Sequence, residues 1–126
     1  MIDARQFTRE WIEAWNAHDL DAVLSHYADD FTMSSPFIVQ LAGVPGGMLQ
    51  GKENVRRYWE TGLQRFPQLR FEPIATFEGA GGLAIHYKGP NGRLSVEVFR
   101  FDAQGLVTQA AAYYQSDVPS ARDLQT

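Results

Sequence analysis

Two residues in the last third of the chain could carry acid–base chemistry. Glu97 interrupts the apolar stretch Val96-Glu97-Val98-Phe99, and burial there would raise the pKa of its carboxyl group. His86 is a second group that can exchange a proton near neutral pH. A histidine and a carboxylate on one face would form a proton-transfer unit. The alternatives are a surface glutamate paired with Lys or Arg, and a structural or exposed histidine.

A predicted hairpin brings these two residues together. Residues 83–88 and 93–101 flank the sequence Gly89-Pro90-Asn91-Gly92, and Asn-Gly is a strong hairpin signal. A two-residue turn places His86 directly opposite Glu97, whereas a four-residue turn places it diagonal to Glu97. Both registers put the two side chains on one face of the sheet. We therefore predict Glu97 and His86 as the catalytic pair.

Aromatic residues make up 13% of the chain, and large rings either fill a core or line a cavity. Trp11, Tyr58, Phe99 and Tyr114 fit both roles, while Trp15 and Trp59 are assigned to the core. The apolar stretch 37–50 is broken by glycines and a proline. It predicts a loop that covers a site or meets a partner.

Hydrophobic periodicity predicts the elements that position these side chains. Apolar residues at steps of three and four predict three helices, over 3–18, 19–31 and 52–66. A short strand follows the second helix, and four later strands with tight turns predict an antiparallel meander. The fold class is therefore α+β, with three helices against an antiparallel sheet and an apolar pocket between them. The predicted strands cover residues 32–35, 69–78, 83–88, 93–101 and 106–115.

Composition narrows the function classes. The 126 residues fit one domain, expected over 1–117 with a flexible tail at 118–126. The net charge of −4, with no basic run longer than Arg56-Arg57, argues against nucleic-acid binding. Without cysteine there is no disulfide or thiol nucleophile. No signal-peptide core or membrane span is evident, so we expect a cytoplasmic protein. No metal-ligand pair or cofactor fingerprint is present, and we expect neither metal nor cofactor.

Four local sequences resemble the nuclear transport factor 2-like superfamily, in particular its SnoaL-like and ketosteroid isomerase-related branch. They are residues 15–21 (WNAHDLD), 27–31 (YADDF), 51–59 (GKENVRRYW) and 97–102 (EVFRFD). The resemblance implies a cone-shaped α+β barrel, in which three N-terminal helices pack in a strongly curved antiparallel sheet. It also implies a homodimer formed through the outer sheet face.

The same resemblance implies positions for a site. Ketosteroid isomerases use an aspartate base and an oxyanion hole made by a tyrosine and a protonated aspartic acid. Trp11 occupies the tyrosine position, Ser35 the position of the base, and Glu97 that of the protonated acid. Serine cannot remove a carbon-bound proton at its ordinary pKa, so that particular isomerisation is not expected. We predict that Trp11, Ser35, Tyr58, Phe99 and Tyr114 bind a small apolar ligand.

Three functions stay open at this point. The first is a cofactor-independent isomerase or cyclase acting on an apolar oxygenated substrate. The second is a non-catalytic protein that binds a small ligand in the same pocket. The third is an interaction module in which the sheet face and the loop at residues 37–49 form a homodimer and the cavity is vestigial.

Overall fold

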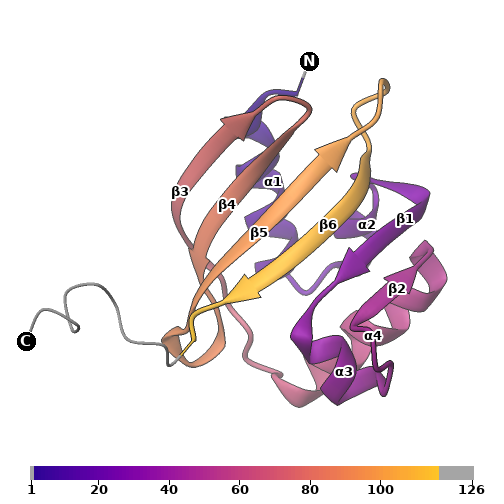
Figure 1. Cartoon of the computed structure of the whole chain (residues 1–126). Helices are drawn as coiled ribbons and strands as arrows, with labels where there is room; N and C mark the ends of the chain where they lie inside the picture. Colours follow the sequence, from indigo (N-terminus) through magenta and orange to yellow (C-terminus); the bar gives the residue numbers. More distant parts are fainter. Residues whose placement is uncertain (1, 117–126) are drawn as a thin grey trace, which may run out of the picture.

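The structure, a computed structural model, describes residues 2–116, which form four α-helices and one six-stranded sheet (Figure 1). This confirms the predicted α+β class. The predicted tail, residues 118–126, lies outside the described residues. The helices are α1 (Ala4–Asn16), α2 (Leu20–Leu24), α3 (Pro36–Ala42) and α4 (Lys52–Arg65). The strands are β1 (Tyr27–Ser34), β2 (Met48–Gln50), β3 (Glu72–Gly79), β4 (Gly82–Lys88), β5 (Leu94–Phe101) and β6 (Val107–Tyr114).

The sheet has the strand order β2-β1-β6-β5-β4-β3. Strands β3 to β6 form the predicted antiparallel meander. However, β1 pairs with β6 in parallel, so the sheet is mixed rather than purely antiparallel. The helices α1 and α2 lie behind the meander, while α3 and α4 lie beside β1 and β2 (Figure 1). The sheet therefore has one face covered by helices and one open face.

The predicted second helix is too long, because residues 27–31 belong to a strand. Helix α2 ends at Leu24, and β1 begins at Tyr27. Tyr27 and Phe31 are both buried, and their spacing of four residues suits one face of a helix as well as one face of a strand. Pairing with β6 decides between the two.

The predicted apolar loop at 37–50 contains helix α3 and strand β2. Ser35 caps α3 by accepting a hydrogen bond from the Phe37 backbone N–H at 3.2 Å, and Pro36 suits the first helical position. Gly43 ends the helix with φ of 69°, a conformation that glycine adopts without strain. The helix turns Phe37 and Leu41 toward the interior, where both line a cavity.

The C-terminal end of α1 is tied to the segment before β3. The Asn16 side chain donates to the Phe71 carbonyl at 3.0 Å and accepts from the Phe71 N–H at 2.7 Å. His18 bonds through Nε2 to the Leu69 carbonyl at 2.9 Å. These contacts hold an irregular segment, which the sheet does not stabilise, against α1.

Candidate active site

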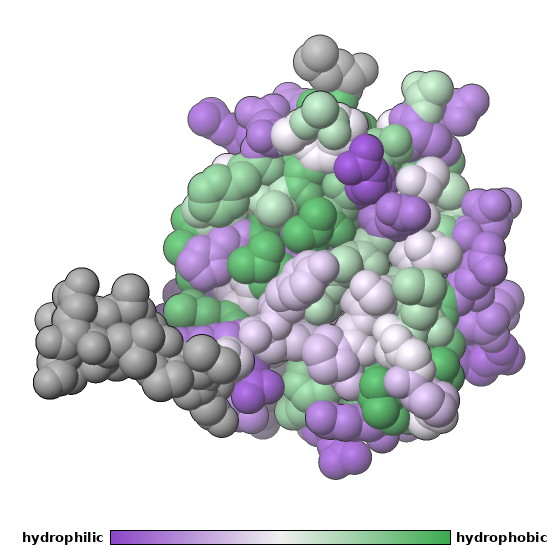
Figure 2. Space-filling view, viewed as in Figure 1, coloured by the Kyte–Doolittle hydropathy of each residue, from purple (hydrophilic) through white to green (hydrophobic). Residues whose placement is uncertain are grey.

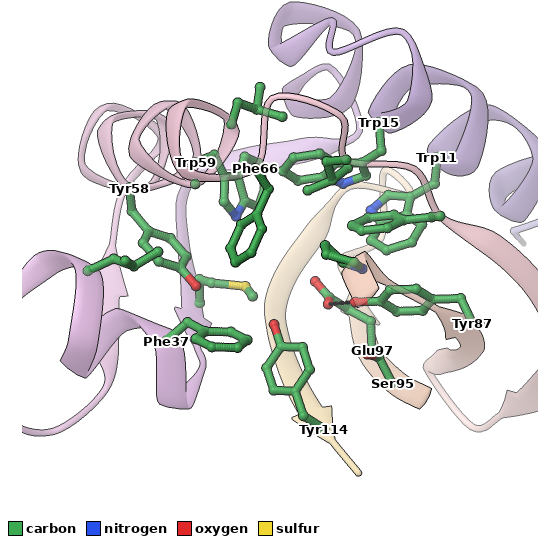
Figure 3. Close-up of a pocket in the computed structure, with 17 residues that line it drawn as sticks. Trp11, Trp15, Phe37, Tyr58, Trp59, Phe66, Tyr87, Ser95, Glu97 and Tyr114 are labelled. Carbon is green, nitrogen blue, oxygen red and sulfur yellow. Dashed lines mark hydrogen bonds between the residues drawn. The ribbon is translucent and has the colours of Figure 1, made fainter. Parts of the chain in front are cut away.

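A cavity of about 100 Å³ lies between the inner face of the sheet and helices α1, α3 and α4 (Figure 3). Its wall is largely apolar and aromatic. A cavity of this size suits one ring-sized molecule, which gains free energy by leaving water. The lining residues are Trp11, Trp15, Met33, Phe37, Leu41, Tyr58, Trp59, Gly62, Leu63, Phe66, Leu69, Phe71, Tyr87, Pro90, Ser95, Glu97 and Tyr114.

Glu97 supplies the carboxyl group of this cavity. Side chains of β5 alternate between the two sheet faces, and Glu97 lies on the inner face with an exposed fraction of 4%. Ala112 of β6 is its cross-strand neighbour, and this small side chain leaves space beside the carboxyl group. Oε1 accepts a hydrogen bond from the Tyr87 hydroxyl at 3.4 Å. The other carboxyl oxygen faces the cavity (Figure 3).

The surroundings of Glu97 favour its neutral form. Burial raises the pKa of Glu97 to about 8, and the hydrogen bond from Tyr87 lowers it only in part. Among the described residues that line this cavity, none is a Lys, Arg, His or Asp that could pair with the carboxylate. At neutral pH the group is therefore mostly a carboxylic acid. Because Tyr87 donates to Oε1, the acidic proton resides on Oε2 and is available to a bound molecule.

The prediction that His86 shares a face with Glu97 is wrong. His86 pairs with Val96, and the residue opposite Glu97 is Ile85. The loop between β4 and β5 comprises residues 89–93 and contains a short 3₁₀ turn at Pro90–Gly92. Both predicted turns have an even number of residues, whereas the observed loop has an odd number. One residue of register moves a side chain to the other face, so His86 lies outside the cavity.

Three of the predicted ligand-binding residues form a group of hydroxyls at the α3–α4 side. Tyr58 and Tyr114 line the cavity, and their hydroxyls point into it (Figure 3). Ser35 lies behind them and accepts a hydrogen bond from the Tyr58 hydroxyl at 3.3 Å. Burial raises the pKa of Tyr58 to about 12 and raises the pKa of Tyr114 as well. Both phenols are therefore neutral hydrogen-bond donors at physiological pH.

The other two predicted ligand-binding residues, Trp11 and Phe99, offer no polar group to a ligand. Trp11 lines the cavity, but its Nε1 donates to the Tyr27 hydroxyl at 3.0 Å, so only its ring faces a ligand. Phe99 is fully buried and packs against Phe7 and Trp11, with ring centroids 5.0 and 5.4 Å apart. It is a core residue that supports the wall and is not among the residues that line the cavity.

Sequence reasoning missed Tyr87 and Phe71, which both line the cavity and pack against each other with ring centroids 4.6 Å apart. Tyr87 shares the inner face of β4 with Leu83 and Ile85, because every second side chain of a strand lies on the same face. This pattern in the sequence could have indicated that Tyr87 faces the interior. Trp15 and Trp59 are buried, as the sequence predicts, yet they also line the cavity.

Residues 2–116 offer no evident metal site. No group of three or more His, Cys, Asp or Glu side chains in this part of the chain could hold a metal ion. None of the helices described there is both long enough and apolar enough to cross a membrane.

Comparisons with known proteins show the family and the fold of the chain. The sequence model of the SnoaL-like domain family matches residues 8–110. A SnoaL-like protein of unknown function from Burkholderia thailandensis is 58% identical, with a TM-score of 0.86 over 90% of this chain and 94% of the other. A search of the curated proteins found no match.

More distant structures share the fold alone. An NTF2-like protein of unknown function from Cytophaga hutchinsonii is 19% identical, with a TM-score of 0.66 over 91% of this chain and 92% of the other. A candidate polyketide cyclase from Sinorhizobium meliloti is 14% identical, with a TM-score of 0.69 over 86% of this chain and 94% of the other.

Proposed function

Because the chain belongs to the SnoaL-like domain family, we propose that its cavity binds a small, neutral, largely apolar molecule that carries an acceptor oxygen. Glu97 donates a hydrogen bond to that oxygen. The observation that carries the proposal is a buried carboxyl group with one oxygen facing an apolar cavity. A carbonyl compound fits this arrangement best, because its oxygen accepts hydrogen bonds and its carbon frame fills the apolar space.

The polar groups at the wall explain why the ligand part inside the cavity is neutral. Protonated Glu97 and the Tyr114 hydroxyl can donate hydrogen bonds to a ligand, whereas the Tyr58 hydroxyl donates its proton to Ser35. No cation lines the described wall to balance an anion. A buried charge without a partner is costly, so an ionised group would stay outside. The apolar rings of the wall instead favour contact with the hydrocarbon part of a ligand.

The same geometry supports cofactor-independent isomerase or cyclase chemistry. A pKa of about 8 allows Glu97 to release and regain a proton near neutral pH, which suits general acid catalysis. Glu97 would protonate the carbonyl oxygen while a proton on the adjacent carbon leaves to water, giving the enol. The reverse process regenerates the carbonyl compound and the carboxylic acid. The Tyr114 hydroxyl would orient the oxygen.

Binding without turnover is the second candidate. Ser35, where related isomerases have a base, caps α3 and bonds to Tyr58. Apart from Glu97 and the tyrosines, no described residue lining the cavity is titratable. A missing second proton acceptor therefore favours a ligand-binding protein with the same Glu97 contact.

A matched pair of probes tests the binding proposal. Acetophenone has a carbonyl oxygen where α-methylstyrene has a CH₂ group, and the two have nearly the same shape. We expect the wild type to bind acetophenone more tightly, because a net hydrogen bond contributes about 1 kcal/mol, roughly fivefold in Kd. Glu97→Gln keeps a donor and retains this preference, whereas Glu97→Leu loses it. Glu78→Leu, at an exposed site on β3, is the control. Equal binding of both probes by the wild type would exclude the carbonyl contact.

Hydrogen–deuterium exchange separates the two candidates. Acid-catalysed enolisation replaces the methyl protons of bound acetophenone by deuterium in D₂O, which NMR detects. If the protein is an enzyme of this class, Glu97→Gln slows exchange at least about 100-fold while binding persists. Binding by the wild type without exchange above the buffer rate, and without turnover across a panel of carbonyl substrates, would favour the non-catalytic candidate.

We also propose a homodimer formed through the open sheet face, as the resemblance implies. Figure 2 shows this face, where apolar side chains gather over β3 to β5. Phe77, Val98 and Tyr113 are exposed by 59%, 38% and 61%.

The cytoplasmic location stays a prediction from the sequence.

A further inference from the structure

A second, wider hollow adjoins the cavity at the end where the β4–β5 loop lies. Its volume is about 660 Å³. Five residues line both spaces, so the cavity and the hollow lie next to each other. The shared residues are Phe37, Phe66, Pro90, Ser95 and Tyr114.

The chemistry of the wall changes between these two spaces. The cavity wall holds no described cation, whereas the outer hollow adds Arg93 and the side-chain amides of Asn91 and Gln115. Burial raises the pKa of Tyr114, and Arg93 acts on it in the opposite direction. Arg93 and Tyr114 line the outer hollow together, and Tyr114 also lines the cavity.

The backbone around Arg93 is held in place. Its carbonyl accepts hydrogen bonds from the Gly89 N–H at 2.8 Å and from the Ser95 hydroxyl at 3.4 Å. The side chain is exposed, and the three ion pairs found in the described part of the chain involve Lys52, Arg56 and Lys88. The backbone of Arg93 is thus held beside the outer hollow, which this residue lines.

We propose that the outer hollow is a second subsite, which binds a carboxylate group of the same ligand through Arg93. The inference rests on the proposed function and deepens it. The ligand would be a keto acid whose apolar carbonyl part lies in the cavity and whose carboxylate reaches the outer hollow. The planar guanidinium matches a carboxylate through two parallel hydrogen bonds. A single cation balances this monoanion better than it balances a phosphate monoester, which carries up to two charges.

Three keto acids of increasing length test the subsite. They are 3-benzoylpropanoate, 4-benzoylbutanoate and 5-benzoylpentanoate, and each is compared with its neutral primary amide by calorimetry at pH 7 and low salt. We expect at least one acid to bind about five- to tenfold more tightly than its amide, the ratio for a charge-assisted hydrogen-bonded pair. This preference should shrink at 300 mM NaCl because salt screens an exposed charge.

Substitutions identify the partner of the carboxylate. Arg93→Gln should reduce the acid-to-amide ratio to about one. Arg93→Lys should keep part of the preference for the acid over the amide. The positive charge remains, but the ammonium group cannot form the two parallel hydrogen bonds of the guanidinium. Arg5→Gln, the same change at an exposed position on α1, is the control and should keep the full ratio.

The outcomes separate this inference from the proposed function. If acetophenone and the amides bind but no acid is preferred, the subsite is wrong and the cavity proposal stands. A preference that survives Arg93→Gln overturns the subsite too. If neither acetophenone nor any amide or acid binds, both proposals fail.

Discussion

At the residue scale, the site depends on a carboxyl group that has lost its water. Glu97 is flanked on the inner face of β5 by Ser95 and Phe99, and its one described hydrogen bond comes from a neutral phenol. Desolvation penalises the charged form of the acid, and a single 3.4 Å contact offsets only part of this penalty. Burial removes water from the carboxyl group and so raises its pKa. The small side chain of Ala112, the cross-strand neighbour, leaves space beside the second carboxyl oxygen.

Glu97 should make the folded protein less stable as the pH rises. The pKa of this group is about 8 in the folded protein, against an ordinary value of 4.5 for a glutamate in an unfolded chain. Between these pH values the folded state binds more protons than the unfolded state, so the free energy of unfolding falls with pH by up to about 1.4 kcal/mol per pH unit. Above pH 8 the contribution is lost and the slope vanishes. Urea titrations at pH 6, 7, 8 and 9 measure it.

The control for this pH dependence is Glu97→Gln, which is neutral at every pH and should lack the slope. Burial lowers the pKa of His26, which makes stability rise with pH around its titration. This opposite contribution is common to both proteins and cancels in the comparison. Parallel curves for wild type and variant would show that Glu97 is already ionised at pH 6.

At the element scale, the face on which a side chain lies depends on the length of a loop. His86 and Glu97 belong to neighbouring strands that the sequence predicts correctly, yet they lie on opposite faces because residues 89–93 form a loop with an odd number of residues. Asn91 adopts φ of 62° and Gly92 φ of 72°, so the Asn-Gly signal marks the turn correctly. It does not determine how many residues flank the turn before pairing begins.

The Asn16 contact with Phe71 should be an important stabilising link between elements. Asn16→Ala removes two hydrogen bonds and leaves a part-buried N–H and carbonyl without their partner. We expect the free energy of unfolding to fall by about 2 to 3 kcal/mol, measured by urea denaturation. Asn54→Ala, at an exposed position on α4, is the control and should change stability by less than about 0.5 kcal/mol. Similar losses in both variants would contradict a special role for Asn16.

At the scale of the whole molecule, the sheet divides two roles between its faces. The inner face and the helices enclose the cavity. The outer face exposes a row of small and apolar side chains across three strands, in which Val98 pairs with Ala84 on one side and Ala111 on the other. An apolar strip of this kind suits contact with a second copy of the chain.

The proposed dimer makes a prediction for Val98. Val98→Lys places a charge at the middle of the strip. At 10 µM we expect sedimentation velocity to show a dimer for the wild type and a monomer for this variant. Val39→Lys, on α3 at 43% exposure, is the control and should remain dimeric. A wild type that sediments as a monomer at 50 µM would refute the interface.

Local patterns in the sequence were sufficient for the α+β class and the four-stranded meander, whereas the burial of Glu97 stayed open until the structure placed it on the inner sheet face. Periodicity and turn residues act over a few neighbours, and these features depend on little else. Tertiary structure decided the rest. Parallel pairing with β6 made residues 27–34 a strand. The loop at residues 89–93 has an odd number of residues, and it placed His86 on the opposite sheet face from Glu97. The cavity itself arises from side chains of distant segments, such as Tyr87, Phe71 and Tyr114, whose meeting no local pattern specifies.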